Sequence, residues 1–361
     1  MASALPQNVC MGREEIAGLL RTQARYCEVL GSQLYAELLE RAARDVDAGG
    51  PAWAVLEGHQ DDPAGSALAL RFMGATHRMV LEGRAPELAR YYPSAGGTPD
   101  PDGAWTALRA LLAGQEQEID ALIEHPVQTN EVGRAAGLIG GFLTVSSRTG
   151  LPLRLLEIGA SAGLLLHWDR FRYEARGATW GPEQSPVRLC DFNSELPLPF
   201  DATASVAERN GCDPAPVDPT TDEGRLTLLS YVWPDQTARI RNLRAALDVA
   251  SAAPAPVEAA GAAEWLEQRL AKQTPGMTTI VYHSIVWQYL SDDQLDRITA
   301  AIESAGGRAT AEAPFAWLRM EAGGDIAHVR LALWPEGADR LVATCSYHGA
   351  AVRWLGYEPA V

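Results

Sequence analysis

The residue types best suited to chemistry gather in Leu155–Gly163, with the sequence Leu-Leu-Glu-Ile-Gly-Ala-Ser-Ala-Gly. Gly159 and Gly163 let the backbone approach a ligand closely, and a following helix would present unpaired N–H groups. Ser161 replaces the central glycine of a strict G-x-G-x-x-G motif, so a tight strand-to-helix turn without a ligand is the alternative. The predicted cofactor contacts of this turn are Glu157, Gly159, Ala160, Ser161 and Gly163.

Asp213 follows a second strand candidate at residues 205–212. A carboxylate at the end of the second strand can accept hydrogen bonds from a ribose diol, usually about 20 residues beyond the glycines. Here it lies 50 residues past Gly163, which requires an insertion at about residues 173–204. We predict that Asp213 binds the cofactor. The alternative, of equal weight, is that Asp213 only forms a turn before Pro214.

His283 ends a strand candidate at residues 278–283 and is the candidate catalytic residue. Side chains at the carboxyl end of a parallel strand face the ligand crevice, and histidine titrates near neutral pH, so His283 could serve as a general base. A half-buried histidine bonded to backbone is the alternative. Trp287 is expected either to wall the substrate pocket or to pack in the core. The third strand candidate ends near Gly261, where an acid near an adenine ring is expected.

Two further polar clusters are candidate substrate contacts. Asn130 and Arg134 begin a helix before the glycine segment, and Trp233 and Asp235 precede another helix. Helix caps are the alternative for both clusters.

Two other kinds of site are disfavoured by spacing. His283, His348 and Asp213 lack close ligand spacing, and the five scattered cysteines form no C-x-x-C pair, so no metal site is predicted. Gly159–Gly163 also reads as G-x-S-x-G, with Ser161 as a hydrolase nucleophile and His348 late enough to complete a triad. That fold, however, needs several strands before the nucleophile.

The elements that must position these residues change in kind near residue 150. Helical spacing of apolar residues predicts helices at residues 13–46, 67–82, 104–123 and 131–145. From residue 151, strands alternate with helices at residues 236–250, 262–270 and 292–305, and the last strand candidates, 327–334 and 341–348, have no helix between them. We therefore predict an all-helical N-terminal domain or lid at residues 1–150. Residues 151–361 are predicted to form an α/β Rossmann-like domain whose mostly parallel sheet ends in an antiparallel β-hairpin.

Composition limits the partners. The chain has 46 acidic and 30 basic residues, a formal charge of −16 and no basic block, so nucleic-acid binding is disfavoured. With no signal peptide and no apolar run long enough to span a bilayer, we expect a cytoplasmic protein without a membrane partner.

The glycine segment, together with residues 126–134, 168–173, 231–236 and 283–290, resembles the bacterial family called domain of unknown function 2332. The resemblance covers nearly the whole chain. It implies a helical N-terminal region on a fold like that of class I S-adenosylmethionine (SAM) methyltransferases, and it assigns no substrate.

The leading hypothesis is a SAM-dependent methyltransferase that acts on a small-molecule acceptor. The second is a non-catalytic binding protein that keeps this fold, since Ser161 and Gly261 depart from the expected pattern. Neither the acceptor nor the oligomeric state follows from the sequence.

Overall fold

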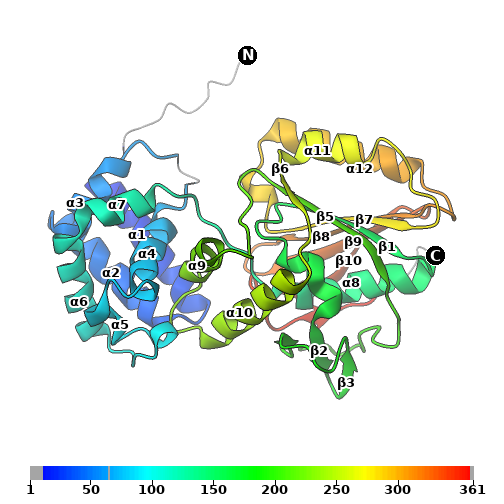
Figure 1. Ribbon diagram of the computed structural model, residues 1–361. Helices are drawn as coiled ribbons and strands as arrows, with labels where there is room; N and C mark the ends of the chain where they lie inside the picture. The colour runs from blue at the N-terminus through cyan, green and yellow to red at the C-terminus, as the bar shows by residue number, and fades with distance from the viewer. Residues whose placement is uncertain (1–10, 64–65, 358–361) are drawn as a thin grey trace, which may run out of the picture. The chain divides into compact units, whose positions relative to one another are not determined.

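The computed structural model describes residues 11–63 and 66–357, which divide into two compact units (Figure 1). One is formed by Met1–Thr129 with Asp222–Arg241, and the other by Asn130–Thr221 with Asn242–Val361. The boundary therefore lies about 20 residues before the expected one at residue 150, and a later segment returns to the first unit. The last predicted helix of the N-terminal region packs on the sheet instead, which explains the difference.

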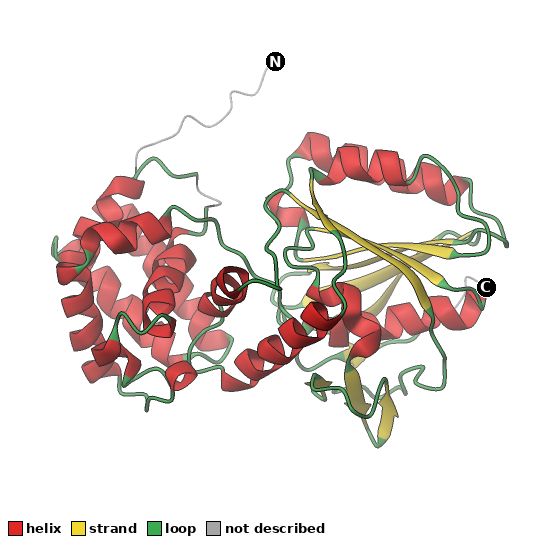
Figure 2. Ribbon diagram, viewed as in Figure 1, coloured by secondary structure: helices red, strands yellow, loops and turns green. Residues whose placement is uncertain are grey.

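The first unit is helical (Figure 2). Its helices in chain order are α1 (Arg13–Val29), α2 (Gln33–Asp47), α3 (Pro51–Leu56), the 3₁₀ turn η1 (Glu57–His59), α4 (Leu68–Leu81), α5 (Pro86–Ala89), η2 (Pro93–Ala95), α6 (Pro101–Gly114), α7 (Glu116–Ile123) and α9 (Asp222–Ser230). Their apolar faces form one core, in which Leu38, Phe72 and Leu108 are fully buried. The helices predicted at residues 13–46, 67–82 and 104–123 are present, whereas α3, α5 and α9 were not predicted.

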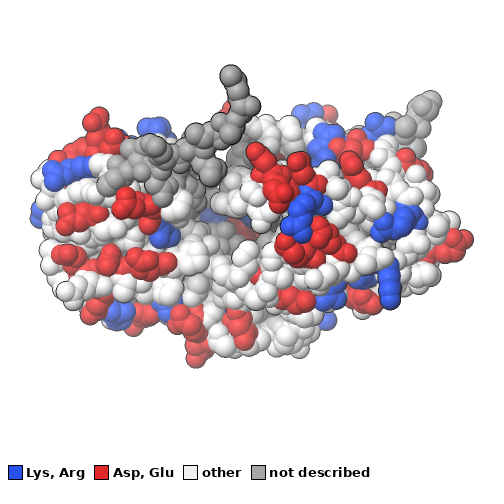
Figure 3. All heavy atoms as spheres, turned by 90° about the horizontal axis from the view of Figure 1, so that it is seen from above, with Lys and Arg blue, Asp and Glu red and all other residues white. Residues whose placement is uncertain are grey.

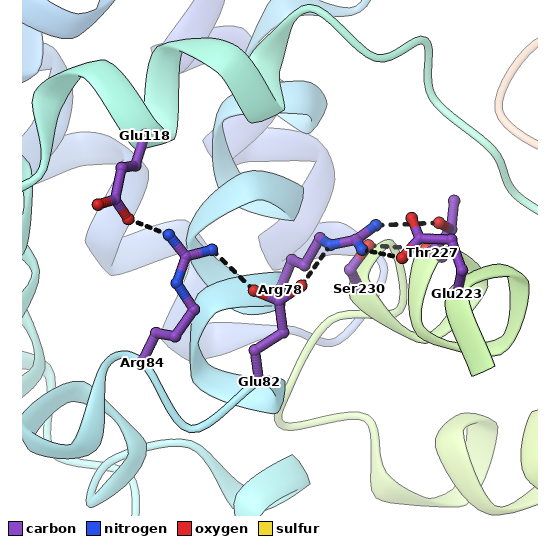
Figure 4. Close-up of polar contacts among 7 residues, drawn as sticks. All are labelled: Arg78, Glu82, Arg84, Glu118, Glu223, Thr227 and Ser230. Carbon is purple, nitrogen blue, oxygen red and sulfur yellow. Dashed lines mark hydrogen bonds and ion pairs between the residues drawn. The ribbon is translucent and has the colours of Figure 1, made fainter.

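Polar contacts attach α9 to this unit although it comes about 140 residues after α4 in the chain (Figure 4). Arg78 on α4 donates from Nε to Glu82 (2.8 Å) and from Nη1 to Thr227 on α9 (3.1 Å). Arg84 bonds Glu82 (2.9 Å), extending the network. These contacts account for the return of residues 222–241 to the helical unit.

The second unit contains an eight-stranded sheet with the order β11-β10-β9-β8-β7-β1-β5-β6. The strands are β1 (Leu153–Ile158), β5 (Val206–Asp213), β6 (Val257–Ala259), β7 (Thr278–Ser284), β8 (Phe315–Ala322), β9 (Ala327–Trp334), β10 (Ala338–Cys345) and β11 (Arg353–Trp354). Strands β6, β5, β1, β7 and β8 are parallel, and β8, β9 and β10 are antiparallel neighbours. The predicted α/β fold with a mostly parallel sheet and a closing hairpin is confirmed.

Helices cover both faces of this sheet. Side chains alternate between faces along a strand, so Val281 and Tyr282 on β7 point to opposite sides. Val281 packs in a core with α11 (Ala262–Arg269) and α12 (Asp292–Gly307), whereas Tyr282 contacts Phe142 of α8 (Arg134–Thr149). The helix α10 (Thr237–Ala252) begins in the helical unit and ends in the sheet unit.

Close packing of α8 on the sheet depends on Gly141. A Cβ atom at this position would lie 2.4 Å from Cδ1 of Leu318 on β8, so a larger residue would push the helix away from the strand. This contact positions the segment just before α8, which reaches the turn at residues 159–163, here called the glycine turn.

The expected insertion is present as a small sheet of β2 (Arg172–Ala175), β3 (Ala178–Trp180) and β4 (Arg188–Leu189). Instead of a long α-helix after the glycine segment, the chain forms the 3₁₀ helix η3 (Leu164–Arg170). Among the described residues, no helix is sufficiently long and apolar to cross a bilayer.

Candidate functional site

The candidate site lies where the order in which the chain adds strands to the sheet reverses. From β1 the chain continues to β5 and β6 on one side, then crosses to β7 and β8 on the other. In open α/β sheets, ligands bind outside the carboxyl ends of the strands at such a switch point. The glycine turn follows β1, Asp213 ends β5, and Ser284 ends β7, so all three reach this edge.

The backbone is strained on both sides of the switch point. Gly159 and Gly163 have φ of 66° and 69°, and Ser161 between them has φ of 51°. Ile285, directly after β7, has φ of 54°, which is costly for a β-branched residue. Two such non-glycine residues in adjacent loops indicate a functional edge of the sheet, because proteins retain strain of this kind mainly where geometry matters.

Asp213 braces the turn. Its Oδ2 accepts the Ser161 N–H at 2.9 Å, and its Oδ1 accepts the Ala215 N–H at 2.9 Å. A carboxylate offers about four lone-pair sites, so Asp213 keeps acceptor capacity for a ligand hydroxyl. The structure brings Asp213 to the turn, as the sequence predicted, and adds a structural role.

Asn130 braces the same turn from the segment before α8. Its Nδ2 donates to the Ala160 carbonyl (3.2 Å), and its Oδ1 accepts the Leu164 N–H (2.8 Å). Asn130 therefore joins the two ends of the turn, a role that differs from the predicted substrate contact and from the alternative of a helix cap.

The amides of the turn are largely engaged within the protein. Ala160 N–H donates to the Cys212 carbonyl (3.0 Å), and Gly163 N–H donates to the Ala160 carbonyl (2.7 Å). With Ser161 bonded to Asp213 and Leu164 to Asn130, four amides of this segment point to protein acceptors. A pyrophosphate needs such amides free, so the turn is poorly suited to a dinucleotide.

Glu157 lies under the turn, 2% exposed, and accepts a hydrogen bond from the Tyr282 hydroxyl at 3.0 Å. Burial raises the pKa of Glu157 to about 8; Asp213 adds to the increase, whereas Tyr282 and Arg134 oppose it. A buried carboxyl without a paired cation favours its neutral form. Glu157 therefore supports the turn from the core rather than presenting a charge to a ligand.

His283 is fully buried and both of its ring nitrogens are engaged. Nδ1 lies 2.6 Å from Oε1 of Glu321, and Nε2 accepts the indole N–H of Trp317 at 3.0 Å. Because Nε2 is the acceptor, the proton of the neutral ring is on Nδ1 and is donated to Glu321. We therefore do not assign His283 as a general base: neither nitrogen is free to take a proton from a substrate.

Trp287 stacks on His283, with ring centroids 4.4 Å apart and planes 5° from parallel. Glu321 also accepts the Val286 N–H (3.0 Å) and the Trp287 N–H (3.3 Å). One carboxylate at the end of β8 thus holds the loop after β7. Sequence reasoning missed Glu321, because only strand pairing brings it to His283.

Val286 links that loop to the glycine turn. A Cβ atom on Gly159 would lie 2.4 Å from Cγ2 of Val286, so glycine is required for the two loops to meet. The close approach of Gly159 is therefore made to a protein side chain as well as to any ligand.

Arg134 lies at the same edge. Its Nε donates to the Tyr347 carbonyl (3.1 Å) and its Nη1 to the Ser284 carbonyl (3.0 Å). These bonds tie the start of α8 to the carboxyl end of β7 and to the loop after β10. Arg134 thus belongs to the cluster that the sequence proposed, in a position that orients backbone.

Trp233 and Asp235, also predicted to bind substrate, lie in the helical unit. Asp235 accepts hydrogen bonds from the Ser32 hydroxyl (2.6 Å) and the Leu34 N–H (3.0 Å), at the start of α2. Trp233 is 6% exposed and packs in the helical core. These contacts explain both residues by folding, and we do not include them in the candidate site.

The described residues contain no group of three His, Cys, Asp or Glu side chains arranged to hold a metal ion. On the face drawn in Figure 3, acidic and basic side chains are interspersed.

A family model described as an uncharacterized protein conserved in bacteria (DUF2332) matches residues 17–354 of the chain. No curated protein and no solved structure matches significantly.

Proposed function

The chain belongs to the DUF2332 family, and we propose that it is a SAM-dependent methyltransferase acting on a small molecule. The observation that carries the proposal is a glycine turn at the switch point of the sheet whose amides are largely engaged by the protein itself. Among nucleoside cofactors of such sheets, SAM needs no amide cradle because it has no phosphate. A dinucleotide does need one.

The residues at this edge fit a nucleoside without phosphates. Asp213 retains lone pairs for a ribose diol, and the backbone at Gly163 lacks a side chain that would block approach. Trp287 supplies an aromatic surface near the end of β7. When bound, SAM supplies an electrophilic methyl group.

Orientation is the main contribution that the protein's own residues would make. Transfer of a methyl group requires the acceptor to be held in line, and proximity alone can contribute a large share of the rate. Asp213 and Asn130 fix the turn, and Glu321 fixes the facing loop. With His283 engaged on both nitrogens, we propose no general base.

Calorimetric titration of the full-length protein with SAM, S-adenosylhomocysteine and NAD tests the proposal. We expect micromolar binding of the first two and none of NAD. The Asp213→Asn variant should weaken SAM binding about tenfold through loss of a charge-assisted hydrogen bond. Asp218→Asn is the matched control, because Asp218 also holds a nearby backbone N–H (Thr220, 2.9 Å) but lies outside the turn. Absence of SAM and S-adenosylhomocysteine binding would overturn the proposal.

A second candidate is hydrolysis with Ser161 as nucleophile, favoured by its φ of 51° within G-x-S-x-G. Its weakness is that β1 is the first strand of the sheet in the chain, whereas a hydrolase fold needs several strands before the nucleophile. Esterase activity that disappears in Ser161→Ala would favour this function. Ligand binding without turnover would instead indicate a binding protein.

A further inference from the structure

A polar pocket lies at the amino ends of β1, β7 and β8, opposite the glycine turn. We propose that this pocket binds a small tetrahedral oxyanion, either free phosphate or the phosphate group of a metabolite. The inference is independent of the glycine turn, which lies at the carboxyl ends of the same strands.

Strand register builds the floor of the pocket. Arg154 on β1 pairs with Thr279 on β7, which in turn pairs with Phe315 on β8. Paired residues in a parallel sheet point to the same face, so these three side chains form a row. The row lies on the face covered by α11 and α12, where Phe315 joins their core.

Three cationic side chains line the pocket: Arg154, Lys272 and Arg308. Its other polar lining residues are Gln273, Thr274 and Thr279, the rest are apolar, and no lining residue is acidic. This composition is unusual in a chain with a net charge of −16, in which Lys272 is the only lysine. The local excess of positive charge therefore contrasts with the chain as a whole.

Existing partners leave this charge incompletely balanced. Arg154 is 8% exposed and pairs with Glu208 at 3.2 Å, but the Glu208 side chain is 45% exposed and its attraction is weakened by solvent. Burial lowers the pKa of Arg154, and the charge of Arg269 acts in the same direction, while Glu208 opposes both. Lys272 has no ion pair within the described parts of the chain.

The C-terminus of α11 also bears on the charge. Arg154 donates to the carbonyl of Arg269, the last residue of α11, and Arg308 donates to the carbonyl of Leu270, the C-cap of the same helix. A helix C-terminus carries a partial charge of about −0.5, so these bonds stabilise the end of α11. Three full cations still exceed one carboxylate and one such terminus by about 1.5 units. Lys272 takes no part in this capping and is free for a ligand.

The size and donor chemistry favour one anionic group. The pocket is small: its cavity volume is about 20 Å³, little more than one water molecule needs, so a ligand can place no more than one small group in it. Guanidinium groups, an ammonium group and threonine side chains line the pocket from β1, β7, residues 272–274 and the end of α12. Donors from several directions suit a tetrahedral phosphate better than a planar carboxylate.

Titration of the full-length protein with inorganic phosphate, against chloride at equal ionic strength, tests the site by calorimetry and ³¹P NMR line broadening. We expect saturable binding with a Kd of about 1 mM or tighter. Lys272→Gln and Arg308→Gln should each weaken it at least about fivefold, since both cations line the pocket. Both side chains are exposed, so these variants test the site without disturbing the buried Arg154.

Arg297→Gln is the matched control. It removes the same charge from α12, but Arg297 pairs with Glu264 and Glu267 and does not line the pocket. Phosphate binding no stronger than chloride binding, or equal loss in Lys272→Gln and Arg297→Gln, would overturn the proposal. Glycerol 3-phosphate distinguishes the sources: tighter binding than inorganic phosphate identifies a metabolite, and equal or weaker binding identifies the free ion. SAM titration of Lys272→Gln separates this site from the glycine turn, because its SAM affinity should be unchanged.

Discussion

Oε1 of Glu321 lies 2.6 Å from Nδ1 of His283 and 3.0 Å from the backbone nitrogen of Val286. One carboxylate oxygen thus joins the end of β7 to the loop that packs against Gly159. The same carboxylate also accepts the Trp287 N–H. A carboxylate only accepts hydrogen bonds, so it can serve all three donors, whereas an amide would place its own NH₂ group against one of them.

We expect Glu321→Gln to lower the free energy of unfolding by about 1–3 kcal/mol, because the amide NH₂ would meet N–H donors. Urea unfolding measures this loss. Glu312→Gln, at an exposed side chain, should change stability by less than about 0.5 kcal/mol. Equal stabilities of the two variants would show that the Glu321 contacts carry no energy.

Glu157 predicts a pH dependence of stability. Its folded pKa of about 8 lies above the ordinary value of 4.5, so the folded state binds more protons between these two pH values. The stability contributed by protonated Glu157 is complete below pH 4.5 and is lost as pH rises through 8. Glu157→Gln stays neutral and keeps an acceptor for Tyr282. It should exceed wild type in stability at pH 9 by about 1–3 kcal/mol, and this advantage should shrink toward pH 5.

Urea unfolding at pH 5, 7 and 9 measures the difference between Glu157→Gln and wild type. A difference that does not change with pH would contradict the raised pKa of Glu157.

Arg209 on β5 should stabilise the segment that follows the glycine turn. It donates two 2.7 Å hydrogen bonds to the two oxygens of Asp169 and a third to the Leu166 carbonyl. Both side chains of the pair are less than one fifth exposed. We expect Arg209→Gln to cost about 2 kcal/mol, as for a largely buried bidentate pair.

Arg188→Gln is the comparison for Arg209→Gln. Arg188 pairs with Glu174, but its side chain is 55% exposed, so its loss should cost less than about 1 kcal/mol. Thermal unfolding followed by circular dichroism ranks the two variants. A smaller loss for Arg209→Gln than for Arg188→Gln would refute the role of burial.

Asp235→Ala separates a folding role from substrate binding. Removal of the carboxylate leaves the Leu34 N–H and the Ser32 hydroxyl without their acceptor, at a cost of about 1–2 kcal/mol. SAM affinity should not change. The exposed Asp61→Ala is the control for stability. If Asp235→Ala left stability unchanged but weakened binding of the methyl-accepting substrate, the substrate-binding role of Asp235 would be restored.

Much of the fold follows from the sequence because periodicity is a local property. Apolar residues at helical spacing gave α1, α2 and α4, and the apolar run before Gly159 gave β1. The glycine turn and the closing hairpin were also local, since each depends on residue types within a short segment, and the insertion followed from the 50-residue gap between Gly163 and Asp213. Asp213 was placed correctly because it ends a strand next to β1.

Tertiary structure decided what those residues do. Strand pairing set Glu321 beside His283 and left the histidine without a free nitrogen, a relationship between residues 38 positions apart that no local pattern encodes. In the same way, the role of Asn130 depends on its hydrogen bonds to Ala160 and Leu164 in the glycine turn. The role of Asp235 depends on the hydrogen bonds that it accepts at the start of α2. Arg154, Lys272 and Arg308 form one pocket only because strand register and two helix ends bring them together. Periodicity determines which face of an element is buried, whereas the chemistry of a site depends on which distant side chains share that buried space.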